Sequence, residues 1–158
     1  MSIDQTTFRK VLGNFATGIT VVTGLTENEI PVGLTVNAFT SLSLSPPLVL
    51  FCLDKRTASI EAFDSEKCFA LNMLNKDQQD LSVIFSTKVE DRFEKVEHTF
   101  WDTGVPILSG CLANLECKID AVHDGGDHLI IVGLVVRLHQ SDNGSPLLYF
   151  NGNYAQIK

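Results

Sequence analysis

The sequence predicts an α+β domain made mainly of antiparallel strands with a few flanking helices. Three observations favour it: several short segments alternate apolar and polar residues, polar or glycine-rich turns separate them, and only a few segments have helical spacing. At 158 residues the chain can bury a sizeable core, so we expect a single domain over residues 1–158. Closure of the sheet into a barrel would remove exposed strand edges, although the alternation leaves closure open.

The N-terminal segment predicts an amphipathic helix, because Phe8, Val11, Leu12 and Phe15 follow the i, i+3, i+4, i+7 spacing. Asp4 is available as its N-cap, and we expect the helix to stop at Gly18.

Two further helices are expected, over 58–63 and over 76–85, with Asn75 as the N-cap of the second. Between 86 and 103 the apolar pattern gives way to crowded charges, which predicts a mobile surface loop or a frayed helix.

The remaining periodic segments predict strands. They cover residues 19–23, 33–39, 48–53, 68–74, 113–121, 128–138 and 147–150. The continuous apolar run 48–53 predicts burial on both faces, whereas 113–121 predicts one wet face carrying Asn114, Glu116, Lys118 and Asp120. The turn 124–127, with Gly125 and Gly126 at its centre, predicts a hairpin.

Residues 30–53 carry no charged side chain, which is unusual for a solvated stretch. Thr35 and Asn37 lie on one face of the alternating run, so that face is small, neutral and rich in hydrogen-bonding groups. Such a face suits a flat, polar-edged heterocycle, because it meets ring heteroatoms without placing a fixed charge beside them.

The segment 54–59 follows with the cations Lys55 and Arg56 and with Ser59 near an expected helix start. Unpaired N–H groups at a helix start favour a phosphate, and a neighbouring cation adds charge. The alternative is that Ser59 is an ordinary helix residue and that the two cations are merely solvated.

Composition excludes several classes of function. The net charge of −7 and the absence of a basic cluster oppose binding to nucleic acid or to an anionic membrane. No signal peptide and no apolar run long enough to span a bilayer is present, which predicts a cytoplasmic protein. The four cysteines and four histidines lack metal-ligand spacing, so we expect no metal and read the cysteines as reduced core thiols.

Five segments, in this order, resemble landmarks of the flavin reductase-like family, the FMN-binding split-barrel reductases that serve two-component flavin monooxygenases. They are residues 15–23, 33–55 with the double proline Pro46-Pro47, 105–110, 126–128 and 146–150. The resemblance runs almost end to end and implies a split β-barrel, with FMN or FAD as cofactor and NADH or NADPH as reductant.

The resemblance also implies the site residues. Those that would border the isoalloxazine, mostly through the main chain, are Thr35, Val36, Asn37, Ala38, Ser41 and Leu42. Those that would hold the ribityl and phosphate groups are Cys52, Leu53, Asp54, Lys55 and Ser59.

On the nicotinamide side the resemblance implies His128 as the catalytic residue, and it implies that Tyr154 shelters the ring or simply packs. A histidine that only hydrogen-bonds its own hairpin is the alternative for His128. Asn151 stands where many relatives have a basic residue, which leaves the choice between NADH and NADPH open.

The expected activity is NAD(P)H:flavin oxidoreductase, with reduced flavin supplied to a partner oxygenase or another acceptor. This chemistry needs aligned cofactors rather than a nucleophile, which fits the absence of a nucleophile–base pair and of nucleotide-binding glycine motifs. The alternatives are a flavin-binding electron-transfer module without NAD(P)H turnover and, less favoured, an oxidase of a pyridoxine-type phosphate. The resemblance further implies a homodimer with the flavin near the subunit interface.

Overall fold

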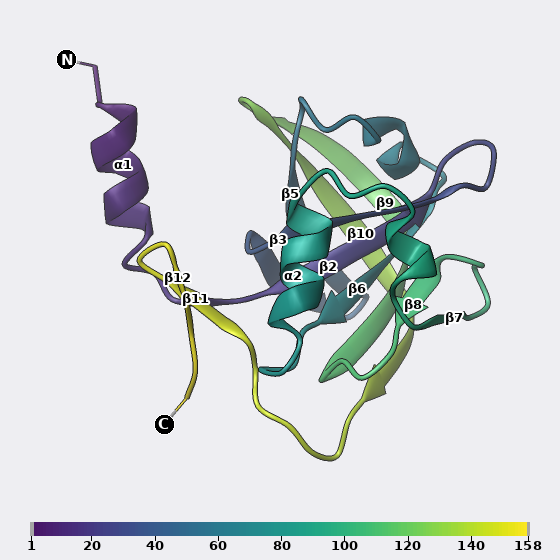
Figure 1. Cartoon of the computed structure of the whole chain (residues 1–158). Coiled ribbons are helices and arrows are strands. Elements are labelled where there is room, and N and C mark those ends of the chain that lie inside the picture. The colour runs from purple at the N-terminus through teal and green to yellow at the C-terminus, as the bar shows by residue number, and fades with distance from the viewer. Residues whose placement is uncertain (1, 158) are drawn as a thin grey trace.

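The computed structural model describes residues 2–157 and shows an antiparallel β domain with two α-helices (Figure 1). The helices are α1 (Gln5–Leu12) and α2 (Gln79–Ser86), with 3-10 turns at Ile60–Phe63 and Arg92–Glu94. The strands are β1 (Thr17–Gly18), β2 (Thr20–Leu25), β3 (Pro31–Val36), β4 (Phe39–Leu44), β5 (Pro47–Asp54), β6 (Cys68–Met73), β7 (His98–Phe100), β8 (Pro106–Leu108), β9 (Ala113–Gly125), β10 (His128–Gln140), β11 (Leu148–Phe150) and β12 (Asn153–Ala155).

The main sheet has seven strands in the order β3-β2-β6-β9-β10-β5-β4. Its two edge strands, β3 and β4, are consecutive in the chain and are joined only by Asn37 and Ala38. The sheet therefore curls round until its edges meet at this short link, without a ladder between them, and forms a split barrel. The predicted fold class is confirmed.

The predicted hairpin of 124–127 is confirmed, because β9 and β10 pair antiparallel along their whole length and turn at Gly126. Gly126 has a φ of +81°, a backbone conformation that favours glycine. On its other side β10 pairs with β5, and His128 lies opposite Asp54. The first residue of β10 is thus placed beside the last residue of β5.

Two apolar clusters support this region. The larger one fills the barrel and centres on edge-to-face contacts of Phe51 with Phe63 and with Phe69. The second packs under α2, where Phe85 is buried and Leu81 and Ile84 lie against it, as the sequence predicted.

Helix α1 differs from a packed amphipathic helix, because none of its residues is buried. Asp4 caps it as predicted, by accepting a hydrogen bond from the Thr7 amide, but the helix ends at Leu12 rather than at Gly18. In Figure 1 the helix stands away from the barrel at the upper left, joined to it by an extended segment.

Several other predictions need correction. Helix α2 begins at Gln79 instead of residue 76, because the side chain of Gln78 accepts a hydrogen bond from the Asn75 amide and Asn75 pairs with Pro146. The segment 86–103 is not a simple surface loop, since it contains β7 and the buried Val96.

Burial was also mispredicted in two strands. Strand β5 alternates between buried and half-buried side chains, because one of its faces lies outside the barrel core. On β9, Asn114 and Glu116 are buried rather than wet, since Asn114 donates to Asn72 and Leu108 while Glu116 accepts from Thr103.

Candidate functional site

Two hollows meet at the split of the barrel. The first has a volume of about 250 Å³ and is lined by Ile19, Thr35, Val36, Asn37, Ser82, Ser86, Tyr149 and Tyr154. The second has a volume of about 160 Å³ and is lined by Leu34, Thr35, Val36, Asn37, Ala38, Cys52, Asp54, Thr57 and His128. The end of β3 is common to both hollows, so they form one composite site, and residues 35–37 are the wall that the two hollows share.

The local sequence explains this wall. Strand β3 is an edge strand, and it ends at Val36 so that the chain can turn into β4. The Thr35 hydroxyl donates to the Ser82 carbonyl at 2.7 Å, and the Ser82 hydroxyl lies 2.9 Å from that of Tyr154. These contacts tie β3, α2 and β12 together around the first hollow.

The second hollow has His128 at its mouth. Its Nδ1 atom lies 2.7 Å from Oδ1 of Asp127, and this contact lowers the pKa of the Asp127 carboxyl. Asp54 lies across from His128, and hydrogen bonds from Arg56 hold the pKa of the Asp54 carboxyl far below its usual value. The mouth therefore carries ionised carboxylates at neutral pH.

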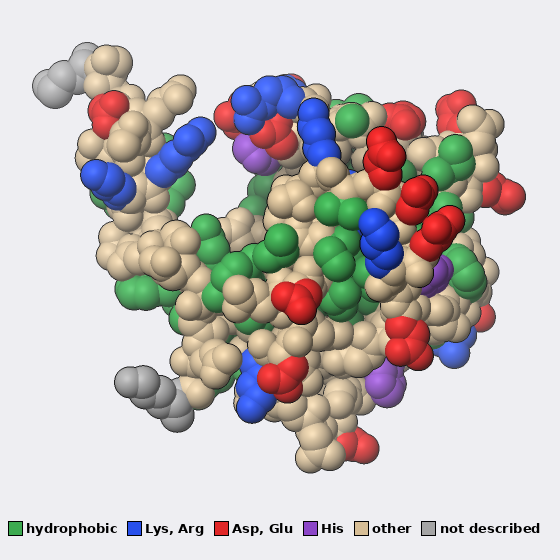
Figure 2. Space-filling view, in the orientation of Figure 1, with side chains coloured by type: hydrophobic (Ala, Val, Ile, Leu, Met, Phe, Trp, Pro, Cys, Tyr) green, Lys and Arg blue, Asp and Glu red, His purple; other side chains and the backbone are tan. Residues whose placement is uncertain are grey.

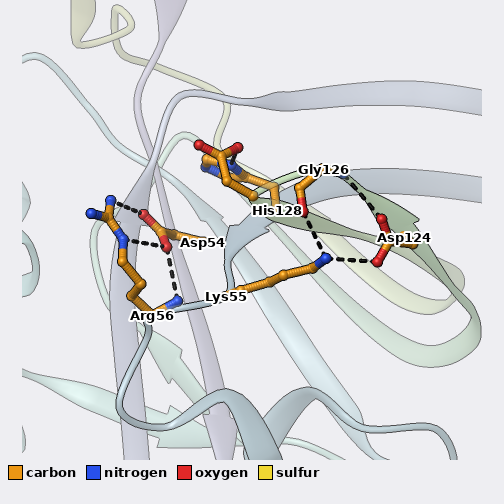
Figure 3. Close-up of polar contacts among 7 residues, drawn as sticks. Asp54, Lys55, Arg56, Asp124, Gly126 and His128 are labelled. Atoms are coloured by element: carbon orange, nitrogen blue, oxygen red, sulfur yellow. Dashed lines mark hydrogen bonds and ion pairs between the residues drawn. The ribbon is translucent and has the colours of Figure 1, made fainter.

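Both cations of the segment 54–59 already have anionic partners (Figure 3). The Lys55 ammonium donates to Oδ2 of Asp124 and to the Gly126 carbonyl, each at 2.6 Å. Arg56 points the other way and donates to both carboxylate oxygens of Asp54, at 3.0 and 2.7 Å. Both cations are therefore engaged in partly exposed ion pairs in this structure, and a phosphate role for Lys55 stays a prediction.

Ser59 lies in a third hollow, of about 460 Å³, lined by Ile30, Pro31, Val32, Gly33, Ser59, Val89, Asp91, Arg92, Phe93 and Glu94. The Arg92 guanidinium donates only to carbonyl oxygens there, those of Gly33, Thr87 and Val89. No carboxylate among residues 2–157 forms an ion pair with it, although Asp91 and Glu94 line the same hollow.

Most of the predicted residues come together. Thr35, Val36 and Asn37 line both hollows, Ala38, Cys52, Asp54 and His128 line the second, and Tyr154 lines the first. Ser41 and Leu42 are exposed on β4 and line none of these three hollows, and the Leu53 side chain is fully buried in the core. Only the main chain of Leu53 could face a ligand.

Sequence reasoning missed several lining residues. They are Ile19, Leu34, Thr57, Ser82, Ser86 and Tyr149. Ser82 and Ser86 are spaced i, i+4, so they lie on the same face of α2. Once Leu81, Ile84 and Phe85 are assigned to the core, this spacing could have predicted that both serines face the site. The pairing that brings Tyr149 near Thr17 connects distant parts of the chain, which periodicity does not reveal.

The composite site fits the groups of a flavin and a nicotinamide. Residues 35–38 offer neutral donors and acceptors beside apolar surface, as a polar-edged ring system requires. Within residues 2–157 no group of three or more His, Cys, Asp or Glu side chains could hold a metal ion. Across the same residues, none of the helices has the length and apolar character needed to cross a membrane.

The fold and site define a split-barrel protein that binds a flat, neutral, polar-edged cofactor where the edges of its sheet meet. A model of the flavin reductase like domain matches residues 12–158. The chain belongs to the flavin reductase-like family, which confirms the predicted family and the prediction of a flavin reductase.

Three similar proteins illustrate the match. The chain is 41% identical to the flavin-dependent monooxygenase reductase subunit HsaB of Mycobacterium tuberculosis, over 99% of the chain and 84% of that protein. It is 44% identical to the FMN reductase (NADH) SmoA of Agrobacterium fabrum, over 95% and 84%. Among solved structures, the NADH:FAD oxidoreductase SgcE6 of Streptomyces globisporus, in complex with NAD and FAD fragments, superposes with a TM-score of 0.92 at 34% identity, covering 98% of this chain and 93% of that one.

Proposed function

We propose that this flavin reductase binds FMN or FAD along residues 35–38 and receives NADH or NADPH on the His128 side of the same wall. Hydride transfer from the reduced nicotinamide to the flavin is chemistry that the cofactors supply. The protein contributes binding, alignment and exclusion of water. The single observation that carries this proposal is the shared wall of the two hollows, because it gives two ring systems adjacent places in one site.

Different residues of the first hollow contact different parts of the flavin ring in this proposal. Asn37 and the main chain of 35–38 present neutral hydrogen-bonding groups to the ring edge, while Ile19 and Tyr149 offer apolar surface. Tyr154, held by Ser82, closes the first hollow. These contacts orient the flavin without a fixed charge beside it.

For the phosphate end we propose Ser59 together with Arg92 in the third hollow. The proposal rests on the Arg92 guanidinium, which forms no ion pair among residues 2–157, since a charge-assisted contact to phosphate is stronger than a neutral one. The main chain of 52–55 then carries the ribityl part, as the family resemblance implies, and the Lys55 ammonium has another role that is argued below.

The experiment that tests the proposal combines binding and turnover. Purified protein is titrated with FMN, FAD and riboflavin while flavin fluorescence is followed, and oxidation of NADH and NADPH is then measured with each flavin. We expect saturable flavin binding and flavin-dependent nucleotide oxidation. Binding without nucleotide oxidation would instead favour an electron-transfer module.

We also propose a separate oxygenase as the acceptor of reduced flavin. Support comes from HsaB, which is named as the reductase subunit of a flavin-dependent monooxygenase. A cytoplasmic location stays a prediction from the sequence.

A homodimer is proposed on the basis of α1. Phe8, Val11, Leu12 and Phe15 are each more than half exposed, although their spacing makes one apolar face. Figure 2 shows hydrophobic side chains on the left, where this arm leaves the body. A second copy of the chain would bury this face, because an apolar stripe of this kind is stable only against another surface.

Light scattering tests the dimer. We expect a dimer for the wild type and a monomer for Val11→Glu, with Arg9→Glu as a control that places a carboxylate on the same helix outside the apolar spacing. A monomeric wild type at micromolar concentration would contradict the proposal.

A further inference from the structure

The Lys55 ammonium is committed to the turn between β9 and β10 rather than to the open hollow (Figure 3). It donates to the Asp124 carboxylate and to the Gly126 carbonyl, both at 2.6 Å. The Lys55 amide also donates to the carbonyl of Asp127 at 3.1 Å. The residue that directly follows β5 thus holds three of the four residues of the turn that leads into His128.

Asp124 completes the arrangement. Its Oδ2 atom accepts from the ammonium, while its Oδ1 atom accepts from the Gly126 amide at 3.1 Å. Gly126 is therefore held through its amide and its carbonyl at once. This matters because its backbone, at a φ of +81°, has the wide freedom of glycine and no side chain to fix it.

We infer that Lys55 is a positioning residue for the reaction, which fixes the turn 124–127 so that His128 stands at the mouth of the second hollow. The inference rests on the proposed function, since it takes His128 as the residue on the nicotinamide side. It replaces the expectation that the Lys55 ammonium binds the flavin phosphate.

The surrounding charges agree with this role. Three carboxylates, those of Asp54, Asp124 and Asp127, lie on or beside the turn. Lys55 forms an ion pair with Asp124, and Arg56 forms one with Asp54. Without the Lys55 ammonium, Asp124 would lose the hydrogen bond that is the main cause of its lowered pKa. Repulsion among the remaining carboxylates would then favour movement of the turn.

The test uses Lys55→Met, with Arg56→Met as the matched control. The control removes the neighbouring cation, whose side-chain hydrogen bonds go to Asp54 rather than to the turn. We expect Lys55→Met to raise the KM for NADH roughly three- to fivefold with flavin affinity unchanged, the size expected for one partly exposed ion pair. Asp124→Asn should have a similar effect, and the double variant should add little to either.

A second readout separates this inference from the role of His128. Amide hydrogen exchange measured by NMR should become faster at Gly126 and at position 55 in Lys55→Met, and should stay unchanged in Arg56→Met. Suppose that exchange is faster in Lys55→Met but that His128→Ala has unchanged kinetics. Lys55 would then still hold the turn, and only the role of His128 in the reaction would be refuted.

The inference is overturned if Lys55→Met leaves both the exchange at Gly126 and the KM for NADH unchanged. It is equally overturned if that variant weakens FMN while sparing riboflavin and NADH, because Lys55 would then be a phosphate ligand.

Discussion

The Nδ1 atom of His128 lies 2.7 Å from a carboxylate oxygen of Asp127, its neighbour in the chain. An ionised carboxylate only accepts hydrogen bonds, so the contact places a proton on Nδ1 and leaves Nε2 as the ring's other nitrogen for a ligand or solvent. The pair stands where the turn 124–127 enters β10, beside Asp54 across the ladder. A fixed imidazole orientation at the mouth of the second hollow follows.

Replacing His128 by alanine should impair the nicotinamide side of the reaction. We expect kcat/KM for NADH to fall roughly tenfold, which corresponds to about 1.4 kcal/mol, with flavin affinity nearly unchanged. His139→Ala is the control, since it removes an exposed histidine from the far end of the same strand. Unchanged reduction kinetics in His128→Ala would remove that residue from the site.

Acidification should release the contact between Asp127 and His128. The pKa of Asp127 is lowered in the folded state, chiefly by the hydrogen bond from His128, so its contribution to stability is present above the unfolded value of about 3.9. It is lost as the pH falls through the lower folded pKa. Urea unfolding of the wild type and Asp127→Asn at several pH values should show a difference at neutral pH that shrinks below about pH 4. A difference independent of pH would contradict this account.

Removing the polar groups of the third hollow should affect FMN more than riboflavin. In the double variant Ser59→Ala, Arg92→Met, a charge-assisted phosphate contact is lost, and we expect FMN to bind roughly tenfold more weakly. Riboflavin, which has no phosphate, is the internal control in fluorescence titrations. Equal losses for both ligands would argue against a phosphate site at Ser59 and Arg92.

NADH should be preferred to NADPH. Asp54, Asp124 and Asp127 lie on or beside the turn that leads into His128, and Lys55 and Arg56 are already paired with two of them, so NADPH, which carries more negative charge than NADH, meets more repulsion as it approaches. We expect kcat/KM to favour NADH, with the ratio narrowing as salt screens the repulsion. A ratio that favours NADPH at low ionic strength would show that a basic residue elsewhere reads the phosphate.

The fold itself can be tested at Gly133, which lies on β10 against Phe69. A Cβ at this position would clash with the Phe69 ring and come within 3.1 Å of the Cys117 Cβ, and Phe69 is fully buried. Gly133→Ala should therefore lower the free energy of unfolding by about 1–3 kcal/mol in urea denaturation. Gly18→Ala is the control, since a Cβ added there would have nothing within 4 Å. A comparable loss of stability in Gly18→Ala would argue against overpacking as the cause.

The sequence predicted those features that depend on residues close together in the chain, such as a helix cap and a hairpin turn. Asp4 caps α1, and the chain turns from β9 into β10 at Gly126. The end of α1 at Leu12 was missed, because Gly13 already closes the last turn by donating to the carbonyl of Arg9.

Long-range partners determined what the sequence did not predict. Glu116 reads as a wet-face residue, yet it is buried because Thr103 donates to it from a loop that periodicity left unassigned. Val96 is buried within a charged stretch for a similar reason, since it packs against the second cluster. At the site, the phosphate role that the family resemblance implied for Lys55 stays a prediction, whereas its contact with Asp124 depends on the folded turn and has no signal in the sequence.

Anaerobic mixing of the flavin-loaded protein with NADH, followed by visible absorbance, tests the central claim most directly. The account predicts that the flavin absorbance bleaches in proportion to the NADH consumed, and that His128→Ala slows the bleaching while Arg56→Met does not. If flavin bound to the wild type keeps its colour in the presence of excess NADH, the two hollows do not form the proposed hydride-transfer site.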